Sequence, residues 1–111
     1  MIHQLNLHLE PFELILNHQK DIEMRLFDDR RKNIQKGDII IFTNIADQRQ
    51  IKAEVISLLN FKSFKELYAF FDKRRLGYKD DEIADYHDMN KYYSDELINK
   101  YGVLAIEIKL I

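Results

Sequence analysis

Three charged side chains near residue 20 have the types and the spacing to build a binding site. Glu23 and Arg25 are two residues apart in a segment, 22–27, that alternates apolar and charged residues, and Lys20 comes just before it. Alternation with a period of two is typical of a β-strand, on which residues two apart point to the same face. The pattern therefore places a carboxylate and a guanidinium side by side, with an ammonium close by.

These three groups suit the recognition of an anion or of a polar base edge. A guanidinium is a planar fork that binds phosphates or carbonyl edges, and an ammonium binds an anion or, when desolvated, serves as a base. A carboxylate between two cations stays ionised and orients both. The simpler interpretation is a solvent-exposed sheet face with cross-strand ion pairs, because charge on a half-exposed strand is common. Spacing alone favours that simpler interpretation.

The composition is that of a globular domain without a prosthetic group. The 111 residues suit one domain, 1–111, and 46% hydrophobic with 32% charged residues is ordinary for such a domain. The absence of cysteine excludes disulfides, thiol catalysis and cysteine-based zinc sites. No glycine-rich phosphate loop and no H-x-x-x-H spacing is present, so we expect no metal and no cofactor. No apolar stretch approaches the roughly 20 residues that span a bilayer, so we expect a cytoplasmic protein without a membrane partner.

Charge is distributed unevenly along a chain whose net charge is −2. Two clusters are basic and lie far apart in the sequence: Arg30, Arg31 and Lys32, and then Lys73, Arg74 and Arg75. Residues 80–96 include seven acidic residues and one basic residue. This segregation predicts a basic face that suits a nucleic-acid backbone and an acidic face that suits a protein partner, although solvated charge on loops and helices gives the same pattern.

The segments that position these residues alternate strands with short helices. We predict strands over residues 3–9, 22–27, 39–42, 51–58 and 103–111, and helices over 11–18, 63–73, 80–91 and 94–101. The short connections between strands favour a mixed or antiparallel sheet over a doubly wound parallel one. The sequence therefore predicts an α+β fold in which a five-stranded sheet curls into a small barrel with flanking helices.

The order of the motifs resembles the ASCH family, whose common pattern is G-x-K-x-x-E-x-R, a basic segment, Gly-Asp and an apolar strand. Here the pattern is filled by Lys20, Glu23 and Arg25, followed by Gly37-Asp38 and the run IIIF. The end of the chain is similar too, with YYS at 92–94, a short acidic helix and YGV at 101–103. His18 departs from the pattern, because the family usually has glycine at that position.

The resemblance implies a PUA-like fold, which is a small β-barrel with helices closing a cleft, and an RNA or nucleotide-like ligand in that cleft. It also implies that Lys20, Glu23 and Arg25 line the cleft. On this hypothesis Tyr93, together with Tyr92, offers a stacking face, although packing at the end of the barrel explains both tyrosines equally well. The two basic clusters would hold the flanking RNA backbone.

Some members of the family are hydrolases, which keeps a second function open. One branch resembles amidohydrolases that deacetylate N(4)-acetylcytidine with a lysine, a threonine and a glutamate, and another is described as a ribonuclease. Lys20 matches the lysine, but Glu23 takes the place of the threonine, and the second carboxylate would lie within residues 80–82. If the protein is an enzyme, Lys20 and Glu23 are its catalytic residues. The attacking group would then be a water molecule that a carboxylate activates, not a threonine alkoxide. A protein-interaction module that uses the acidic segment is the third hypothesis.

Overall fold

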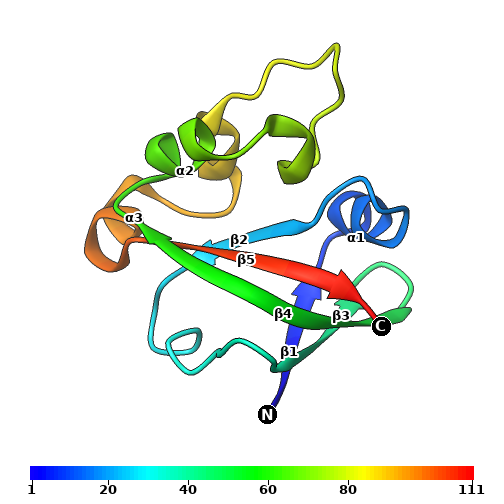
Figure 1. Ribbon diagram of the computed structural model, residues 1–111. Coiled ribbons are helices and arrows are strands. Elements are labelled where there is room, and N and C mark those ends of the chain that lie inside the picture. Colours follow the sequence, from blue (N-terminus) through cyan, green and yellow to red (C-terminus); the bar gives the residue numbers. More distant parts are fainter.

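Five strands and three short helices make up the computed structural model, which describes residues 1–111 (Figure 1). The strands are β1 (Ile2–Leu7), β2 (Ile22–Leu26), β3 (Ile39–Asn44), β4 (Gln50–Phe61) and β5 (Val103–Leu110). The helices are α1 (Leu9–Leu16), α2 (Phe64–Phe70) and α3 (Asp95–Tyr101), with 3-10 turns at Lys73–Leu76 and Tyr86–Lys91. None of these helices is long and apolar enough to cross a membrane.

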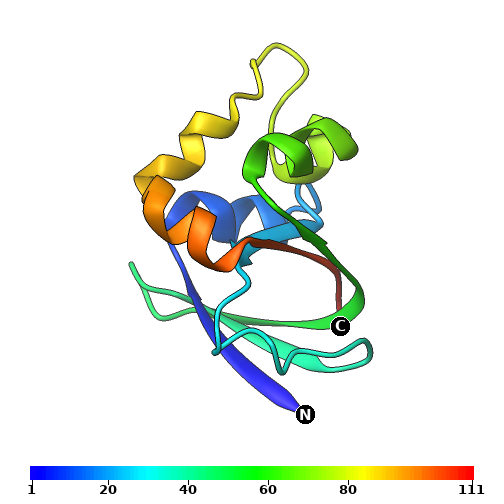
Figure 2. The same cartoon turned by 90° about the vertical axis from the view of Figure 1, so that its left-hand side faces the viewer.

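The strands form one mixed sheet in the order β1-β3-β4-β5-β2. β1 runs parallel to β3, and the other three pairs are antiparallel. The long strand β4 pairs with β3 through its first half and with β5 through the rest, and its register shifts between Val55 and Ser57. Such an irregularity bends a strand and increases its twist, and Figure 2 shows the sheet curling. This half-barrel with flanking helices confirms the predicted α+β fold.

The curled sheet leaves an open seam, because its two edge strands pair with one neighbour each. β1 pairs only with β3, and β2 pairs only with β5. A closed barrel would join β1 and β2 by a ladder of backbone hydrogen bonds. Backbone groups at the seam therefore need other partners or water.

The hydrophobic core is divided between the two faces of β5. Leu104, Ile106 and Ile108 pack inside the curled sheet with α1, whereas Val103 and Ala105 pack outside it beneath α2 and α3. Figure 1 shows α2 above β2 and β5, with β1 and β3 below them. Both faces of β5 are therefore covered.

Strand β2 is covered on both faces in the same way, and this decides where its charged residues lie. Ile22, Met24 and Leu26 pack outward under the helices. In the register with β5, Glu23 lies opposite Ile106 and Arg25 opposite Leu104, so the charged pair shares the inner face. The solvent-exposed sheet face favoured by spacing alone is wrong, because this face is enclosed by the curl of the sheet.

Several predicted boundaries hold, and one predicted helix is wrong over half its length. Ser63 Oγ accepts a hydrogen bond from Glu66 N and so caps α2 at the predicted start of that helix. Of the helix predicted over 80–91, only the 3-10 turn from Tyr86 forms. The carbonyls of Asp80 and Glu82 accept hydrogen bonds from Lys73 Nζ, at 3.0 and 2.5 Å, instead of continuing a helix.

Asp38 fastens the N-terminus of β1 to the turn that precedes β3. Its carboxylate accepts hydrogen bonds from His3 Nε2 at 2.8 Å, from Gln35 N at 2.9 Å and from the terminal ammonium at 3.2 Å. These bonds, led by that of His3, lower the pKa of Asp38 from 3.8 to about 2. Because the folded pKa lies below the unfolded one, this carboxylate stabilises the fold above about pH 4 and loses that effect as the pH falls towards 2.

We therefore expect Asp38→Asn to lower the free energy of unfolding at neutral pH and to flatten its decline between about pH 4 and pH 2. The measurement is urea unfolding of both proteins across that pH range. Asp81→Asn removes an exposed carboxylate that has no hydrogen-bond partner and serves as the control. A pH profile of Asp38→Asn that runs parallel to the wild-type profile would contradict the assignment.

Candidate functional site

Lys20, Glu23 and Arg25 form a chain of buried ion pairs. Lys20 Nζ lies 3.3 Å from Glu23 Oε1. Arg25 Nε donates to Glu23 Oε2 at 2.9 Å, and Arg25 Nη2 lies 2.8 Å from the same oxygen. The three side chains are only 9%, 5% and 12% exposed. Buried charges are tolerated only when they are paired and hydrogen-bonded, so each member of this chain depends on the others.

The field of the two cations keeps Glu23 ionised despite its burial. Burial alone would raise the pKa of Glu23, but Lys20 and Arg25 together outweigh it and lower the pKa below its usual value. Burial opposes the charge of Arg25 too, yet Glu23 and Tyr93 raise the pKa of its guanidinium. The mutual pairing of Glu23 and Arg25 therefore favours the charged form of both groups.

Arg25 also bridges the open seam of the sheet. Its Nη2 donates to the backbone carbonyl of Asn6 at 2.7 Å, across the gap between β2 and β1. One side chain thus takes the place of the missing backbone ladder. Because the same guanidinium holds Glu23, its plane is fixed by partners on both edge strands.

A cavity of about 150 Å³ opens at this seam, and we call it the seam cavity. Its walls come from β1 and the start of α1, from the charged chain on β2, and from the 3-10 turn near residue 89: Asn6, Leu7, His8, Pro11, Lys20, Glu23, Met24, Arg25, Met89, Tyr92 and Tyr93. An engineered protein cavity of this size holds a benzene molecule. The seam cavity therefore has room for one six-membered ring.

The two tyrosines contribute differently to the seam cavity. Tyr93 stacks on Phe64, with ring centroids 6.1 Å apart, and burial raises the pKa of its hydroxyl. Tyr92 is 46% exposed, and its ring lies 5.7 Å from that of His8. Tyr93 is therefore the more closely packed of the two, while Tyr92 is partly exposed at the rim.

A tight turn after α1 brings Lys20 to the site. His18 adopts the left-handed backbone conformation, with φ of 61°, where the ASCH pattern has glycine. Gln19 N donates to Leu14 O at 2.8 Å, which closes the turn. Histidine is among the residues that tolerate this conformation, so the turn forms here without a glycine at that position.

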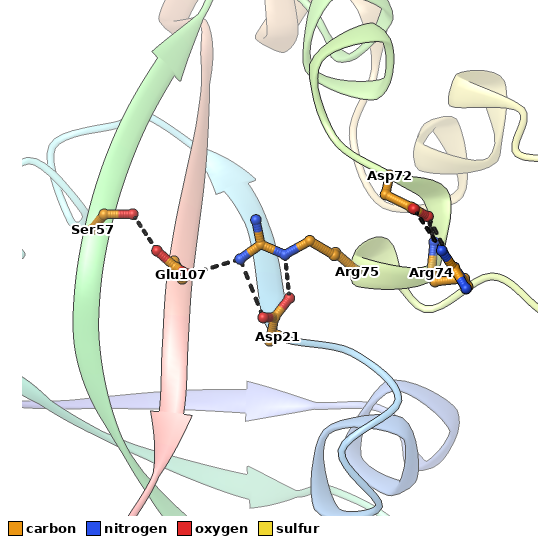
Figure 3. Close-up of polar contacts among 6 residues, drawn as sticks. All are labelled: Asp21, Ser57, Asp72, Arg74, Arg75 and Glu107. Atoms are coloured by element: carbon orange, nitrogen blue, oxygen red, sulfur yellow. Dashed lines mark hydrogen bonds and ion pairs between the residues drawn. The ribbon is translucent and has the colours of Figure 1, made fainter.

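The basic clusters lie outside the seam cavity, and most of their charge is paired within the chain. Arg31 binds Asp28 at 2.7 Å, Lys32 lies 3.4 Å from Asp29, and Arg30 is exposed. In the second cluster Arg74 pairs with Asp72, while Arg75 binds Asp21 and Glu107 (Figure 3). Their contact with an RNA backbone stays a prediction, as does a protein partner for the exposed acidic residues 80–82.

Sequence reasoning missed several walls of the seam cavity. Asn6 and His8 alternate with leucines, in the same way as Glu23 and Arg25 alternate with apolar residues. That alternation could have indicated that Asn6 and His8 share the polar face of their own segment. Met89 gave no signal, because it reaches the seam cavity only through the packing of the outer core. No cluster of three metal-ligating side chains occurs in the structure.

Comparison with known proteins identifies similar chains over the full length. The model of the ASCH domain matches residues 5–111. The crystal structure of the hypothetical protein PH0355 is 32% identical with a TM-score of 0.84, and each chain is covered completely. The solution structure of protein PF0455 from Pyrococcus furiosus is 29% identical with a TM-score of 0.75, covering 100% of this chain and 98% of the other.

A more distant structure shares the fold. The ASCH domain from Lactobacillus crispatus is 14% identical with a TM-score of 0.69, covering 98% of this chain and 79% of the other. No curated protein matches the chain.

The dependence of the two cations on Glu23 predicts a large loss of stability in Glu23→Gln. The neutral amide leaves Lys20 and Arg25 buried without a counter-charge, and breaking a buried ion pair in this way costs about 3 kcal/mol or more. Chemical denaturation at neutral pH measures the loss.

Asp29→Asn is the matched control, because it breaks an exposed pair with Lys32 whose carboxylate is 91% exposed. Exposed pairs contribute about 0.2–1 kcal/mol. Equal losses in the two variants would show that the chain of ion pairs at the seam is not buried as described.

Proposed function

This chain belongs to the ASCH domain family, a family generally associated with RNA binding, and we propose that it binds RNA or a nucleotide in the seam cavity. One observation carries the proposal. A buried chain of ion pairs, formed by Lys20, Glu23 and Arg25, lines a cavity of one-ring size, with an exposed tyrosine at its rim. Arg25 also holds the seam of the sheet, whereas Lys20 forms no ion pair other than the one with Glu23.

The charged chain retains donors for a ligand after its internal bonds are made. An arginine has five N–H donors and a lysine three. Arg25 uses Nε and Nη2 on Glu23 and on the carbonyl of Asn6, which leaves the N–H groups of Nη1. Lys20 directs one donor to Glu23. The remaining donors suit a base carbonyl or a phosphate oxygen, and the lone pairs of Glu23 suit an exocyclic amino group.

The size of the seam cavity favours a base that is not paired in a duplex. Sequence-specific recognition of RNA uses single-stranded bases that are splayed out, stacked on aromatic rings and hydrogen-bonded along their edges. Tyr92 and His8 supply aromatic rings, and the charged chain supplies the edge contacts. We therefore propose that Lys20, Glu23, Arg25 and Tyr93 contact one base, with Tyr92 stacking on it or on its neighbour.

The flanking backbone is proposed to follow the basic residues that keep free charge. Arg30 is exposed and takes part in none of the ion pairs of the chain. Arg31, Lys32, Lys73, Arg74 and Arg75 would have to exchange an internal partner for a phosphate. Exchanging one partner for another contributes less net free energy to binding than forming a new contact does. Arg30 is therefore the basic residue that we most expect to contact a phosphate.

Tyr92→Ala tests the stacking contact. We expect it to weaken binding of a short single-stranded oligoribonucleotide by about 1–3 kcal/mol, which is the usual loss for one stacked base. Fluorescence anisotropy measures the affinity. Phe70→Ala is the control, because Phe70 is 63% exposed and lies outside the seam cavity. Equal affinities for Tyr92→Ala and the wild type would remove the stacking contact from the proposal.

Lys20→Gln tests the electrostatic contact and leaves Glu23 paired with Arg25. If Lys20 meets a phosphate, the slope of log affinity against log salt should fall by about 0.7, the value for one contact on a single strand. Lys36→Gln removes an exposed lysine outside the seam cavity and should leave the slope unchanged. No binding at any salt concentration would end the proposal, and equal slopes in all three proteins would exclude a contact between Lys20 and a phosphate.

Hydrolysis of a modified nucleoside is the second candidate, because Lys20 Nζ and Glu23 Oε1 lie 3.3 Å apart beside the seam cavity. A general base works best with a pKa near the working pH. The lowered pKa of Glu23 makes it a weak base, which favours binding over turnover.

Turnover of an acylated cytidine, followed by chromatography, decides between the two functions. We expect no turnover above background. The opposite result would be turnover in the wild type that Lys20→Ala and Glu23→Ala each abolish, while circular dichroism shows both variants to be folded. That result would favour hydrolysis over binding as the function.

A further inference from the structure

We propose that a second, larger cavity next to Lys20 is a phosphate-binding subsite for the nucleotide whose base enters the seam cavity. This inference rests on the proposed function and adds to it a place for the anionic part of the ligand. The cavity has a volume of about 770 Å³, within the range of about 300–1,000 Å³ that is usual for ligand pockets. We call it the basic cavity.

The basic cavity lies where three segments that are distant in sequence meet. One wall is the last turn of α1 with His18, another is the 3-10 turn Lys73–Leu76 with the loop after it, and the third is the end of β5 near Lys109. Asp21 N donates to Arg75 O at 3.1 Å, which joins the second wall to the start of β2. The cavity is thus bounded by elements that backbone hydrogen bonds hold together.

The charge of the basic cavity is opposite to that of the chain. Its lining includes five lysine and arginine residues and two aspartates: Lys20, Arg74, Arg75, Lys79, Lys109, Asp21 and Asp80. The whole chain has a net charge of −2. A concave surface with an excess of one sign of charge concentrates ions of the other sign, so the basic cavity should attract an anion.

The cations of this lining have two separate roles. Arg75 binds Asp21 at 3.0 Å and Glu107 at 2.7 Å, and Glu107 also accepts a hydrogen bond from Ser57 (Figure 3). This network fixes the wall and neutralises Arg75. Lys79 and Lys109 are exposed and take part in no ion pair of the chain. Their charge is available to a ligand.

Lys20 is the one residue that lines both the basic cavity and the seam cavity. Its stem passes the backbone of Gly77, where an added Cβ would lie 3.4 Å from Lys20 Cδ and 3.1 Å from Leu14 Cδ1. Its Nζ ends beside Glu23 in the seam cavity. A ligand that spans the two cavities would therefore meet Lys20 between its base and its phosphate.

The shared chemistry of the expected ligand is a phosphate group attached to a nucleoside. It has two possible sources, which are the backbone of a single RNA strand and the phosphate of a free nucleotide. A strand places a phosphate on each side of every base, and a mononucleotide carries its phosphate on one side only. The same pair of lysines would bind either.

The test compares Lys79→Ala/Lys109→Ala with the matched control Lys36→Ala/Lys65→Ala, which removes two exposed lysines outside both cavities. Calorimetry measures binding of a pyrimidine nucleoside, its 5′- and 3′-monophosphates, an oligoribonucleotide and inorganic pyrophosphate. We expect phosphate to improve nucleoside affinity at least about tenfold in the wild type and in the control, since hydrogen bonds to charged groups are strong. We expect the first variant to lose that gain while it still binds the nucleoside.

The outcomes separate the two proposals. If nucleoside and monophosphates bind equally, or if both double variants behave alike, the phosphate subsite is overturned and base binding stands. If the nucleoside fails to bind while pyrophosphate binds the wild type and not the first variant, the basic cavity is supported as an anion site and the proposed function falls. A loss of affinity for the oligoribonucleotide with a decrease of about 1.4 in its salt slope assigns the phosphates to an RNA strand. A loss confined to the monophosphates assigns them to a free nucleotide.

Discussion

The side chain of Arg25 carries the constraint on which the rest of this structure depends. The five-stranded sheet curls until its edge strands face each other, but β1 and β2 form no backbone ladder. The guanidinium closes the gap by donating to the carbonyl of Asn6 on one side and to Glu23 on the other. An unpaired strand edge can pair with another chain and so promote aggregation. Here the side chain of Arg25 binds a backbone carbonyl on the edge of β1, and the seam cavity lies beside this contact.

The enclosure of Arg25 determines the electrostatics of its neighbours. The buried guanidinium of Arg25 needs a carboxylate partner, which is Glu23, and Lys20 forms a second ion pair with the same carboxylate. The outer face of the same strand is covered by α2, α3 and the 3-10 turns, so β2 has no face in water. Polar groups that are held on the rigid inner face of a sheet are already positioned for a ligand, which lowers the entropic cost of binding.

Much of the fold follows from local patterns. The period of two located four of the strands, and the continuous apolar run IIIF located β3. The helices α2 and α3 are capped by Ser63 and Ser94, where the predicted helices begin. The helix expected over 80–91 is half absent because Lys73, seven residues earlier than Asp80, binds the carbonyls of that loop. Periodicity does not include such competition from a distant side chain. The parallel pairing of β1 with β3 also depends on contacts that no local pattern contains.

By itself the sequence determined which side chains share a face: the alternation along 22–27 puts Glu23 and Arg25 together and places Lys20 near them. It also determined the family, through the order and spacing of its motifs. Only the tertiary structure decided that this shared face is buried and not wet, that Asn6 and His8 join it, and that Arg75 is a structural cation while Lys79 and Lys109 are free. The physical reason is that side-chain direction follows from backbone geometry within a strand, whereas burial and charge pairing depend on which distant segments cover that strand.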